Sequence, residues 1–341
     1  MKILYAFQGT GNGHVARARD LVPRFAAYGE LDVLCAGVQS ELDLGYPIKY
    51  HRHGLSMVYN SRGSVSYWKS LISYKLFRFV RDIISLPVKQ YDLIVIDFEA
   101  VTSYACKLRG VKSIQLSHQA AYWSDGAPRP EKREELWEWV MRNMSPSTYA
   151  LGFHFGPYDS FVLPPIIRKE IRELSPQNTG HITVYLPSYS AAYLVEYLSQ
   201  FPQYSFRVFS KEAESYNSDN VNVKKADVNE FLKSFSMCAG IICGAGFEAP
   251  AEALYLGKKV LVIPIAGQYE QQANAAAARE MGVASVSVLN AESAREINRW
   301  LAEENGQKID WPDYAGLLVE RIVDNCRKNL AWDQIEGLDI W

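Results

Sequence analysis

The chain has 341 residues, more than one hydrophobic core usually organises, so its length predicts two domains with a cleft between them. Hydrophobic residues make up 48% and charged residues 22%, as in ordinary globular proteins, and the formal net charge of -2 gives no general attraction to nucleic acid. The five cysteines have no CxxC spacing, which argues against a disulfide framework or structural zinc and favours a cytoplasmic protein.

The first half alternates predicted strands and helices. An apolar strand over residues 2–7 runs into the glycine-rich segment from Gly9 to Gly13, and a helical pattern follows over residues 15–28. Strands are expected at 31–36, 91–97 and 113–116, and a helix at 101–108. The apolar run at 91–97 does not alternate, which is typical of a strand buried in a parallel sheet. No signal-peptide segment is recognised, and no run approaches the roughly 20 apolar residues of a membrane span.

A second series of alternating elements begins after residue 178. Strands are expected at 181–186, 204–209, 240–243 and 260–264, with helices at 191–201, 228–235 and 249–256, whereas 177–180 and 215–220 have loop-like compositions. The pattern predicts an α/β protein of two Rossmann-like, doubly wound domains facing a cleft. The expected division is residues 1–176 and 177–341, with the last helix packing back on the first domain.

Residues 67–84, from Tyr67 to Ile84, form an amphipathic and basic segment that predicts one helix. One interpretation is a surface helix that packs its apolar face on the sheet. The other is an interfacial helix that contacts anionic lipid, which would suit a lipid-linked acceptor and place the protein peripherally on the inner face of the membrane.

The most informative segment runs from Ile241 to Ala277. A strand ends in the turn Gly244-Ala245-Gly246, and the helix that follows has Pro250 in its first turn, where proline is tolerated. The unpaired amides of such a helix start, together with its dipole, can hold a diphosphate. Glu252 lies near enough to bond a ribose, and the next strand delivers a polar cluster to the same sheet edge, where ligands of α/β sheets bind. The polar cluster comprises Gly267, Glu270, Gln271, Gln272 and Asn274.

This segment resembles the donor-site motif of GT-B glycosyltransferases, especially MurG-like enzymes and the UDP-glycosyltransferase superfamily. The N-terminal GTGNGHV is similar to the glycine turn of MurG-like proteins, with Asn12 in place of a glycine. The resemblance implies an inverting, metal-independent transfer of a hexosyl group from a nucleotide diphosphate sugar, with a uracil or thymine base, and with no separate cofactor. The acceptor would be a hydroxyl of a glycan or glycolipid, such as one of the cell envelope.

The resemblance also implies site residues. The donor diphosphate would bind at the turn formed by Gly244, Ala245, Gly246 and Phe247, and the ribose would bind at Glu252. The sugar hydroxyls would bind at the polar loop, through Gly267, Glu270, Gln271 and Gln272. The interval to Asn274 is one residue shorter than in MurG-like enzymes, so the register of Gln271 and Gln272 stays open. The N-terminal turn, with Gly11, Asn12 and Gly13, would contact phosphate or acceptor.

His14 closes the N-terminal glycine turn and is a candidate general base, because a neutral imidazole can take the acceptor proton near pH 7. Asp97, at the end of a predicted strand, is either the rival base or the group that orients His14, and Glu99 is a third candidate. His118 ends another strand and is a candidate acceptor ligand or a packed histidine. The remaining histidines have no metal-ligand spacing, so no metal is expected.

Two other enzyme classes remain as alternatives. The N-terminal glycines could open the dinucleotide site of an oxidoreductase, although His14 stands where the third glycine of GxGxxG belongs. A nucleotide-sugar 2-epimerase or hydrolase of the same fold would require additional acids, for which Asp97 and Glu99 are candidates. A non-catalytic binding protein is the third alternative, and it predicts no stabilisation by nucleotide diphosphates.

Overall fold

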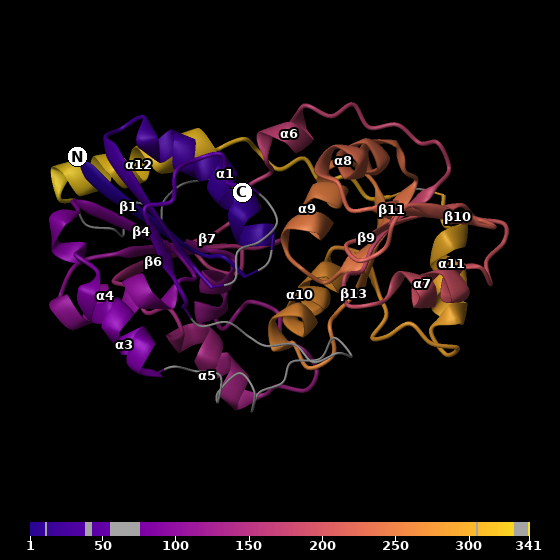
Figure 1. Cartoon of the computed structure of the whole chain (residues 1–341), viewed down its shortest axis with the longest axis horizontal. Helices are drawn as coiled ribbons and strands as arrows, with labels where there is room; N and C mark the ends of the chain where they lie inside the picture. The colour runs from indigo at the N-terminus through magenta and orange to yellow at the C-terminus, as the bar shows by residue number, and fades with distance from the viewer. Residues whose placement is uncertain (11, 38–42, 55–75, 305, 331–339) are drawn as a thin grey trace.

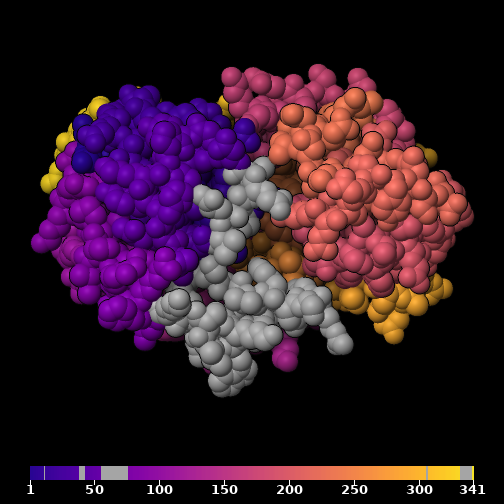
Figure 2. All heavy atoms as spheres, viewed as in Figure 1, coloured from indigo at the N-terminus to yellow at the C-terminus, as the bar shows by residue number. Residues whose placement is uncertain are grey.

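The computed structural model describes residues 1–10, 12–37, 43–54, 76–304, 306–330 and 340–341. These residues form two lobes that lie side by side (Figures 1 and 2). Each lobe is built on a seven-stranded sheet with helices on both faces (Figure 1). The helix α6 (Lys169–Arg172) lies in the connection between the two sheets.

The first sheet is parallel throughout, in the order β3-β2-β1-β4-β5-β6-β7. Its strands are β1 (Lys2–Gln8), β2 (Glu30–Ala36), β3 (Tyr50–Arg52), β4 (Leu93–Asp97), β5 (Ile114–Ser117), β6 (Tyr149–Phe153) and β7 (Val162–Leu163). The connecting helices are α1 (Asn12–Ala26), α3 (Leu76–Ser85), η1 (Val88–Gln90), α4 (Ala100–Arg109), η2 (His118–Trp123) and α5 (Glu135–Asn143). These elements make up the N-terminal lobe. The strand order reverses between β1 and β4, which is the position where ligands of open α/β sheets bind.

The second sheet has the order β10-β11-β9-β8-β12-β13-β14 and is parallel except for the pair β10 and β11. Its strands are β8 (Ile182–Tyr185), β9 (Phe206–Ser210), β10 (Tyr216–Ser218), β11 (Val221–Lys225), β12 (Gly240–Gly244), β13 (Lys259–Ile263) and β14 (Ala284–Ser285). The helices are α7 (Ala191–Leu198), α8 (Val228–Met237), α9 (Glu248–Tyr255), α10 (Tyr269–Glu280) and α11 (Ala294–Ala302). These elements make up the C-terminal lobe, and here the order reverses between β8 and β12.

Alternate side chains of the buried strands serve two separate cores. In β1, Tyr5 and Phe7 pack with α1, whereas Leu4 and Ala6 pack with α3 and α4 on the other face. Successive side chains of a strand point to opposite faces, so a strand covered on both sides must be apolar at every position. This requirement explains the continuous apolar runs in the sequence.

The end of the chain returns to the N-terminal lobe. The helix α12 (Ala315–Lys328) packs against α1, beside β1 in Figure 1. Arg327 donates a hydrogen bond to the carbonyl of Tyr28 at 3.2 Å, and Cys326 donates one to the carbonyl of Asp92. The chain therefore crosses between the lobes twice.

The doubly wound α/β architecture predicted from the sequence is confirmed, although several elements were not expected, among them β6, β7, β11 and α11. Two of the predicted segments also differ from the structure. The helix α1 begins at Asn12 rather than residue 15, so Gly13 and His14 belong to its first turn. The segment 215–220 is not all loop, because β10 pairs with β11 across a turn at Asp219. Tyr216 is exposed on this edge strand, which therefore lacks the apolar run that marks a buried strand. Of the predicted helix at 67–84, residues 67–75 lie outside the described residues.

Candidate active site

The first turn of α1 places His14 beside Asp97. Asp97 is the last residue of β4, and β4 pairs with β1, which leads into α1. His14 Nδ1 lies 2.9 Å from Asp97 Oδ1, with the His14 side chain 12% exposed and Asp97 fully buried. The two candidates for the base therefore form one hydrogen-bonded pair at the switch point of the first sheet.

Arg17 completes this group from one turn further along α1. Its Nε and Nη2 each donate to one oxygen of Asp97 at 3.0 Å, a two-point arrangement that fixes the carboxylate plane. Its third nitrogen, Nη1, donates to Glu248 Oε1 at 2.6 Å. Glu248 belongs to the first turn of α9, so Arg17 joins the two lobes. Sequence reasoning missed Arg17, although its i,i+3 spacing from His14 places both on one face of α1.

The charges in this group determine the protonation of its members. Burial acts to lower the pKa of His14, but the Asp97 carboxylate outweighs it, and the pKa is raised. Burial acts to raise the pKa of Asp97, but Arg17 and His14 hold it below its ordinary value. Asp97 is therefore an ionised hydrogen-bond acceptor for His14 over the physiological pH range.

The backbone after β4 has an unusual conformation. Phe98 has a φ of +53°, in the left-handed region that non-glycine residues seldom adopt, and its ring stacks near His14 at a centroid distance of 6.4 Å. Such strain costs on the order of 1–3 kcal/mol and is concentrated at functional sites. Glu99 follows and accepts hydrogen bonds from the amides of Val101 and Thr102, so this carboxylate serves as the N-cap of α4.

In the C-terminal lobe, the turn Gly244-Ala245-Gly246 leads from β12 into α9. Among the described residues, no atom lies within 4 Å of a Cβ placed on Gly246, so these residues leave space for a ligand beside this backbone. The N-cap residue, Phe247, makes no side-chain capping bond, which leaves the first-turn amides of α9 for another acceptor. The Arg17 to Glu248 ion pair brings this helix start against the start of α1. The turn therefore lies at the junction of the lobes, at the second switch point.

Glu252, predicted as a ribose ligand, is buried in α9 and paired with Arg168 from the connection between the sheets. Arg168 donates from Nε and Nη2 to the two carboxylate oxygens at 2.6 and 2.9 Å. The carboxylate raises the pKa of Arg168 against the opposing effect of burial. No local pattern in the sequence distinguishes Arg168 as a site residue.

The side chains of the polar cluster at the start of α10 have different hydrogen-bond partners. Gln271 Oε1 accepts a hydrogen bond from the Ile265 amide at 2.9 Å, and Glu270 accepts one from Gln119 of the N-terminal lobe at 3.0 Å. Gly267 has a φ of +75°, a conformation that favours glycine. Gln272 is half-buried, and its side chain has no hydrogen-bond partner within the described part of the chain.

His118 lies in a contact between the lobes. The residue is 1% exposed, and its ring stacks on Phe247 at a centroid distance of 4.1 Å and donates from Nδ1 to the Phe153 carbonyl. His118 Nε2 lies 2.6 Å from Oδ1 of the buried Asn274, which also accepts a hydrogen bond from Tyr122. Burial lowers the pKa of His118. In this arrangement His118 and Phe247 join the lobes to each other.

Three further observations concern other parts of the molecule. Gly11 lies outside the described residues, while Asn12 and Gly13 begin α1. Within the described ranges, no group of three or more His, Cys, Asp or Glu residues is arranged to hold a metal ion, and none of the helices is long and apolar enough to cross a bilayer.

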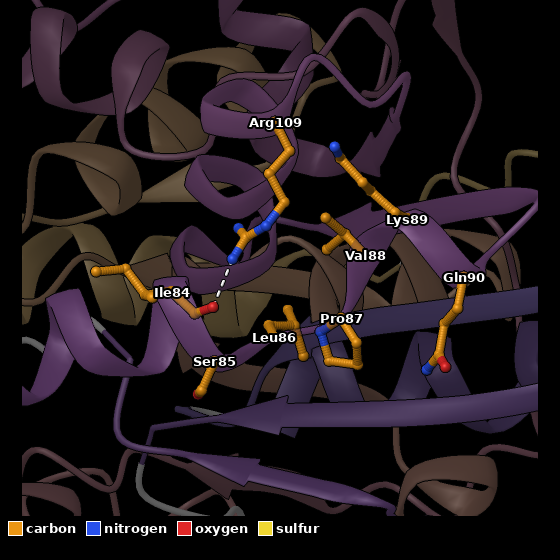
Figure 3. A pocket seen from close by; sticks show the side chains of 8 residues that line it. All are labelled: Ile84, Ser85, Leu86, Pro87, Val88, Lys89, Gln90 and Arg109. Carbon is orange, nitrogen blue, oxygen red and sulfur yellow. Dashed lines mark hydrogen bonds between the residues drawn. The ribbon is translucent and has the colours of Figure 1, made fainter.

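An open hollow of about 510 Å³ is lined by residues 84–90 and Arg109, which donates to the Ile84 carbonyl (Figure 3). Apart from Ile84, which ends the basic segment predicted from the sequence, none of these lining residues is a candidate site residue.

Comparisons with solved structures support the same fold. The glycotransferase of kitacinnamycin matches with a TM-score of 0.59 and 14% identity over 98% of this chain and 96% of that one. A UDP-glucosyltransferase from Polygonum tinctorium capable of glucosylating indoxyl gives 0.58 and 14% over 98% and 96%. Acinetobacter baumannii MurG gives 0.50 and 16% over 96% and 99%.

No curated protein matches the sequence significantly. The family model for glycosyl transferase family 1, however, matches residues 1–303. That range includes both lobes, the His14 and Asp97 pair and the turn at Gly246. The chain therefore belongs to glycosyl transferase family 1 and is a GT-B glycosyltransferase.

Proposed function

We propose that this glycosyltransferase moves a hexosyl group from a UDP-sugar to an acceptor hydroxyl, with inversion at the anomeric carbon and without a metal ion. One observation carries the proposal. The His14 and Asp97 pair at one switch point and the open turn at Gly246 at the other are brought together by the Arg17 to Glu248 contact. A base on one lobe and an anion site on the other are the two parts that a displacement at an anomeric carbon requires.

In the proposed step, Asp97 accepts the Nδ1 hydrogen of His14, so that Nε2 carries the lone pair. Nε2 takes the proton of the acceptor hydroxyl while its oxygen attacks the anomeric carbon. The bond between that carbon and the diphosphate oxygen breaks, and its electron pair leaves with UDP. Attack opposite to the leaving group inverts the configuration. Asp97 is fully buried with a lowered pKa, which favours an orienting role over that of the base.

The donor diphosphate is proposed to bind at Gly244, Ala245, Gly246 and Phe247. Unpaired amides and the positive end of the α9 dipole would stabilise the charge that develops on the leaving group, in place of a cation. The UDP-glucosyltransferase among the structural neighbours supports a uridine donor. The oxidoreductase alternative has no support, since the family is one of glycosyltransferases.

Glu252 is proposed to bind the ribose hydroxyls while paired with Arg168. The Arg168 fork uses one lone pair on each carboxylate oxygen, and a second pair on each can accept from a hydroxyl. The sugar hydroxyls are assigned to the start of α10, with Gly267, Glu270, Gln271 and Gln272. Gln271 uses its oxygen on Ile265, and its amide group can donate to the sugar.

We assign donor binding to residues 177–341 and acceptor binding to residues 1–176, with Gly11, Asn12 and Gly13 as candidates near the acceptor. His118 is not among them, because its buried ring has both nitrogens in contacts within the protein. The exposed surface of helix α3 supports the proposal that the acceptor is a glycolipid or envelope glycan at the inner face of the cytoplasmic membrane. Phe77 is 83% exposed, Val80 and Ile84 follow it on the same helical face, and Arg78 and Arg81 are exposed beside them. Exposed apolar groups flanked by arginines are typical of helices that lie on anionic bilayers.

Vesicle flotation tests the membrane part of the proposal. The parent is expected to float with vesicles containing anionic phospholipid and to stay in solution with neutral vesicles, because arginine attraction falls without surface charge. Phe77→Asp should abolish flotation. The exposed α11 residue Asn298, changed to Asp, is the matched control for the added charge. Equal flotation of Phe77→Asp and the parent would remove α3 as the contact.

Thermal unfolding with nucleotides tests the donor assignment. UDP should raise the melting temperature more than dTDP, GDP or NAD, because a ligand that binds only the folded state stabilises it. The reaction itself is tested by incubating the protein with UDP-hexoses and glycan or glycolipid acceptors, with and without EDTA. The products should have the anomeric configuration opposite to that of the donor, in undiminished yield with EDTA. Retained configuration would overturn the single displacement.

A further inference from the structure

The candidate base is connected to the donor lobe through a continuous set of charge-assisted hydrogen bonds. Glu248 contacts Arg17, Arg17 holds both oxygens of Asp97, and Asp97 holds His14. The Arg17 side chain is 4% exposed, so these bonds lie where water screens them little. Three of the four members come from the N-terminal lobe, and only Glu248 comes from the C-terminal lobe.

The contact between Glu248 and α1 is built closely. A Cβ on Gly13 would lie 2.6 Å from Glu248 Oε2, so a larger residue would displace the carboxylate from its position against the first turn of α1. The negative charge of Glu248 then lies at the start of two helices, α1 and α9, where both dipoles favour it. Arg17 uses Nη1 for this bond and its other two nitrogens for Asp97, so the position of the guanidinium depends on both carboxylates.

We propose that Arg17 is a positioning residue through which docking of the donor lobe orients the His14 and Asp97 pair for catalysis. The inference rests on the proposed role of His14 as the base. When the lobes separate, Arg17 loses Glu248 and is held on one side only, so the Asp97 carboxylate and the His14 ring are less firmly fixed. The general base is then correctly oriented only when the donor turn at Gly246 lies against the N-terminal lobe. The acceptor hydroxyl would therefore be activated only in the docked enzyme.

Within the described ranges, the charged groups that act on His14 are Asp97 at the end of β4, Arg17 on α1 and Glu248 on α9. Burial lowers the pKa of His14 and Arg17 lowers it further, whereas Asp97 and Glu248 raise it. Removing the charge of Glu248 should therefore lower this pKa, and removing the charge of Arg17 should raise it. These opposite shifts distinguish an electrostatic connection from a general loss of structure.

The test compares the pH dependence of kcat/KM in Glu248→Gln, Arg17→Gln and Arg17→Lys. Glu248→Gln should move the acidic limb to lower pH, and Arg17→Gln should move it to higher pH. Arg17→Lys keeps the charge but cannot hold both carboxylate oxygens, so kcat should fall about tenfold, with KM for the donor little changed. A tenfold loss lies within the interaction free energies measured between contacting residues. The Glu248→Gln/Arg17→Lys double variant should lose no more activity than the worse single variant.

Glu280→Gln is the matched control, because Glu280 accepts a hydrogen bond from Tyr158 of the other lobe and does not act on His14. Its acidic limb should match that of the parent. If the limb stays in place in both Glu248→Gln and Arg17→Gln, the positioning role is wrong. Because Glu248 is partly exposed, Glu248→Gln should fold, and it tests the positioning role even if Arg17→Gln fails to fold. An acidic limb that persists unchanged in His14→Gln would instead refute the base assignment.

Discussion

The Nδ1 atom of His14 lies 2.9 Å from Oδ1 of Asp97, at the point where the order of the first sheet reverses. The bond fixes the tautomer of the imidazole, because Nδ1 carries the hydrogen and Nε2 is left as the acceptor. Removing the ring should therefore lower catalysis without disturbing the donor site on the other lobe.

His14→Gln is expected to lower kcat by about 10²–10⁴-fold, the usual contribution of a general base. UDP affinity, measured by calorimetry, should stay within twofold of the parent, because the proposed nucleotide contacts come from α9 and α10. His53→Gln, a change at an exposed histidine on the same lobe, is the control. Unchanged turnover in His14→Gln would transfer the base role to another group.

The raised pKa of His14 predicts the acidic side of the pH profile. The neutral ring is the active form, so kcat/KM should fall as pH drops through the pKa of His14, with a midpoint above the ordinary value of 6.5. Asp97→Asn removes the carboxylate that raises this pKa, so the midpoint should move to lower pH and kcat should also decrease. A midpoint that moves to higher pH in Asp97→Asn would contradict this account.

Glu252→Gln tests the ribose assignment. The parent should bind UDP more tightly than 2′-deoxy-UDP, and the variant should bind both with similar affinity, with UDP weakened about tenfold or more, as expected for a lost hydrogen bond to a charged group. Calorimetry with both nucleotides measures this difference. Glu170→Gln, at another carboxylate of the connecting region, should bind UDP like the parent. Full discrimination in Glu252→Gln would remove the assignment.

Asn274→Ala tests the contact between the lobes. The change leaves the polar groups of His118 and Tyr122 buried without this partner, at a cost of about 1–3 kcal/mol for each unsatisfied group. Chemical denaturation should therefore show a large loss in free energy of unfolding. Asn298→Ala, on the exposed side of α11, should stay within about 0.5 kcal/mol of the parent. Similar stabilities of the two variants would show that the contact contributes little.

The sheets and most of their helices could be predicted from the sequence, because their signals are local. The run from Leu93 to Ile96 is apolar at every position, as a strand buried on both faces must be. The strand β10 has no such signal, since Tyr216 and its neighbours lie on an exposed edge. The first turn of α1 could not be predicted because glycines usually mark a loop, whereas here Gly13 makes room for Glu248.

The ion pairs at the site could not be predicted in the same way. Arg17 and Glu248 are 231 residues apart, and Arg168 and Glu252 are 84 apart. Each of the four reads in isolation as a charged residue on a helix or in a connecting segment, which is usually exposed to solvent. Only the docking of the lobes and the path of the connecting chain bring the charges together. The glycine motifs can be recognised from the sequence because each depends on the backbone of a single turn.

The most direct test of the donor site is the affinity of Gly246→Ala for UDP and for uridine. The φ of Gly246 is outside the left-handed region, and its Cβ would meet none of the described residues within 4 Å, so the variant should fold with the melting temperature of the parent. The added methyl group would occupy the position proposed for the diphosphate, so UDP affinity should fall at least about tenfold, or about 1.4 kcal/mol, while uridine affinity is unchanged. Parental affinity for UDP in Gly246→Ala would contradict a phosphate site at this turn.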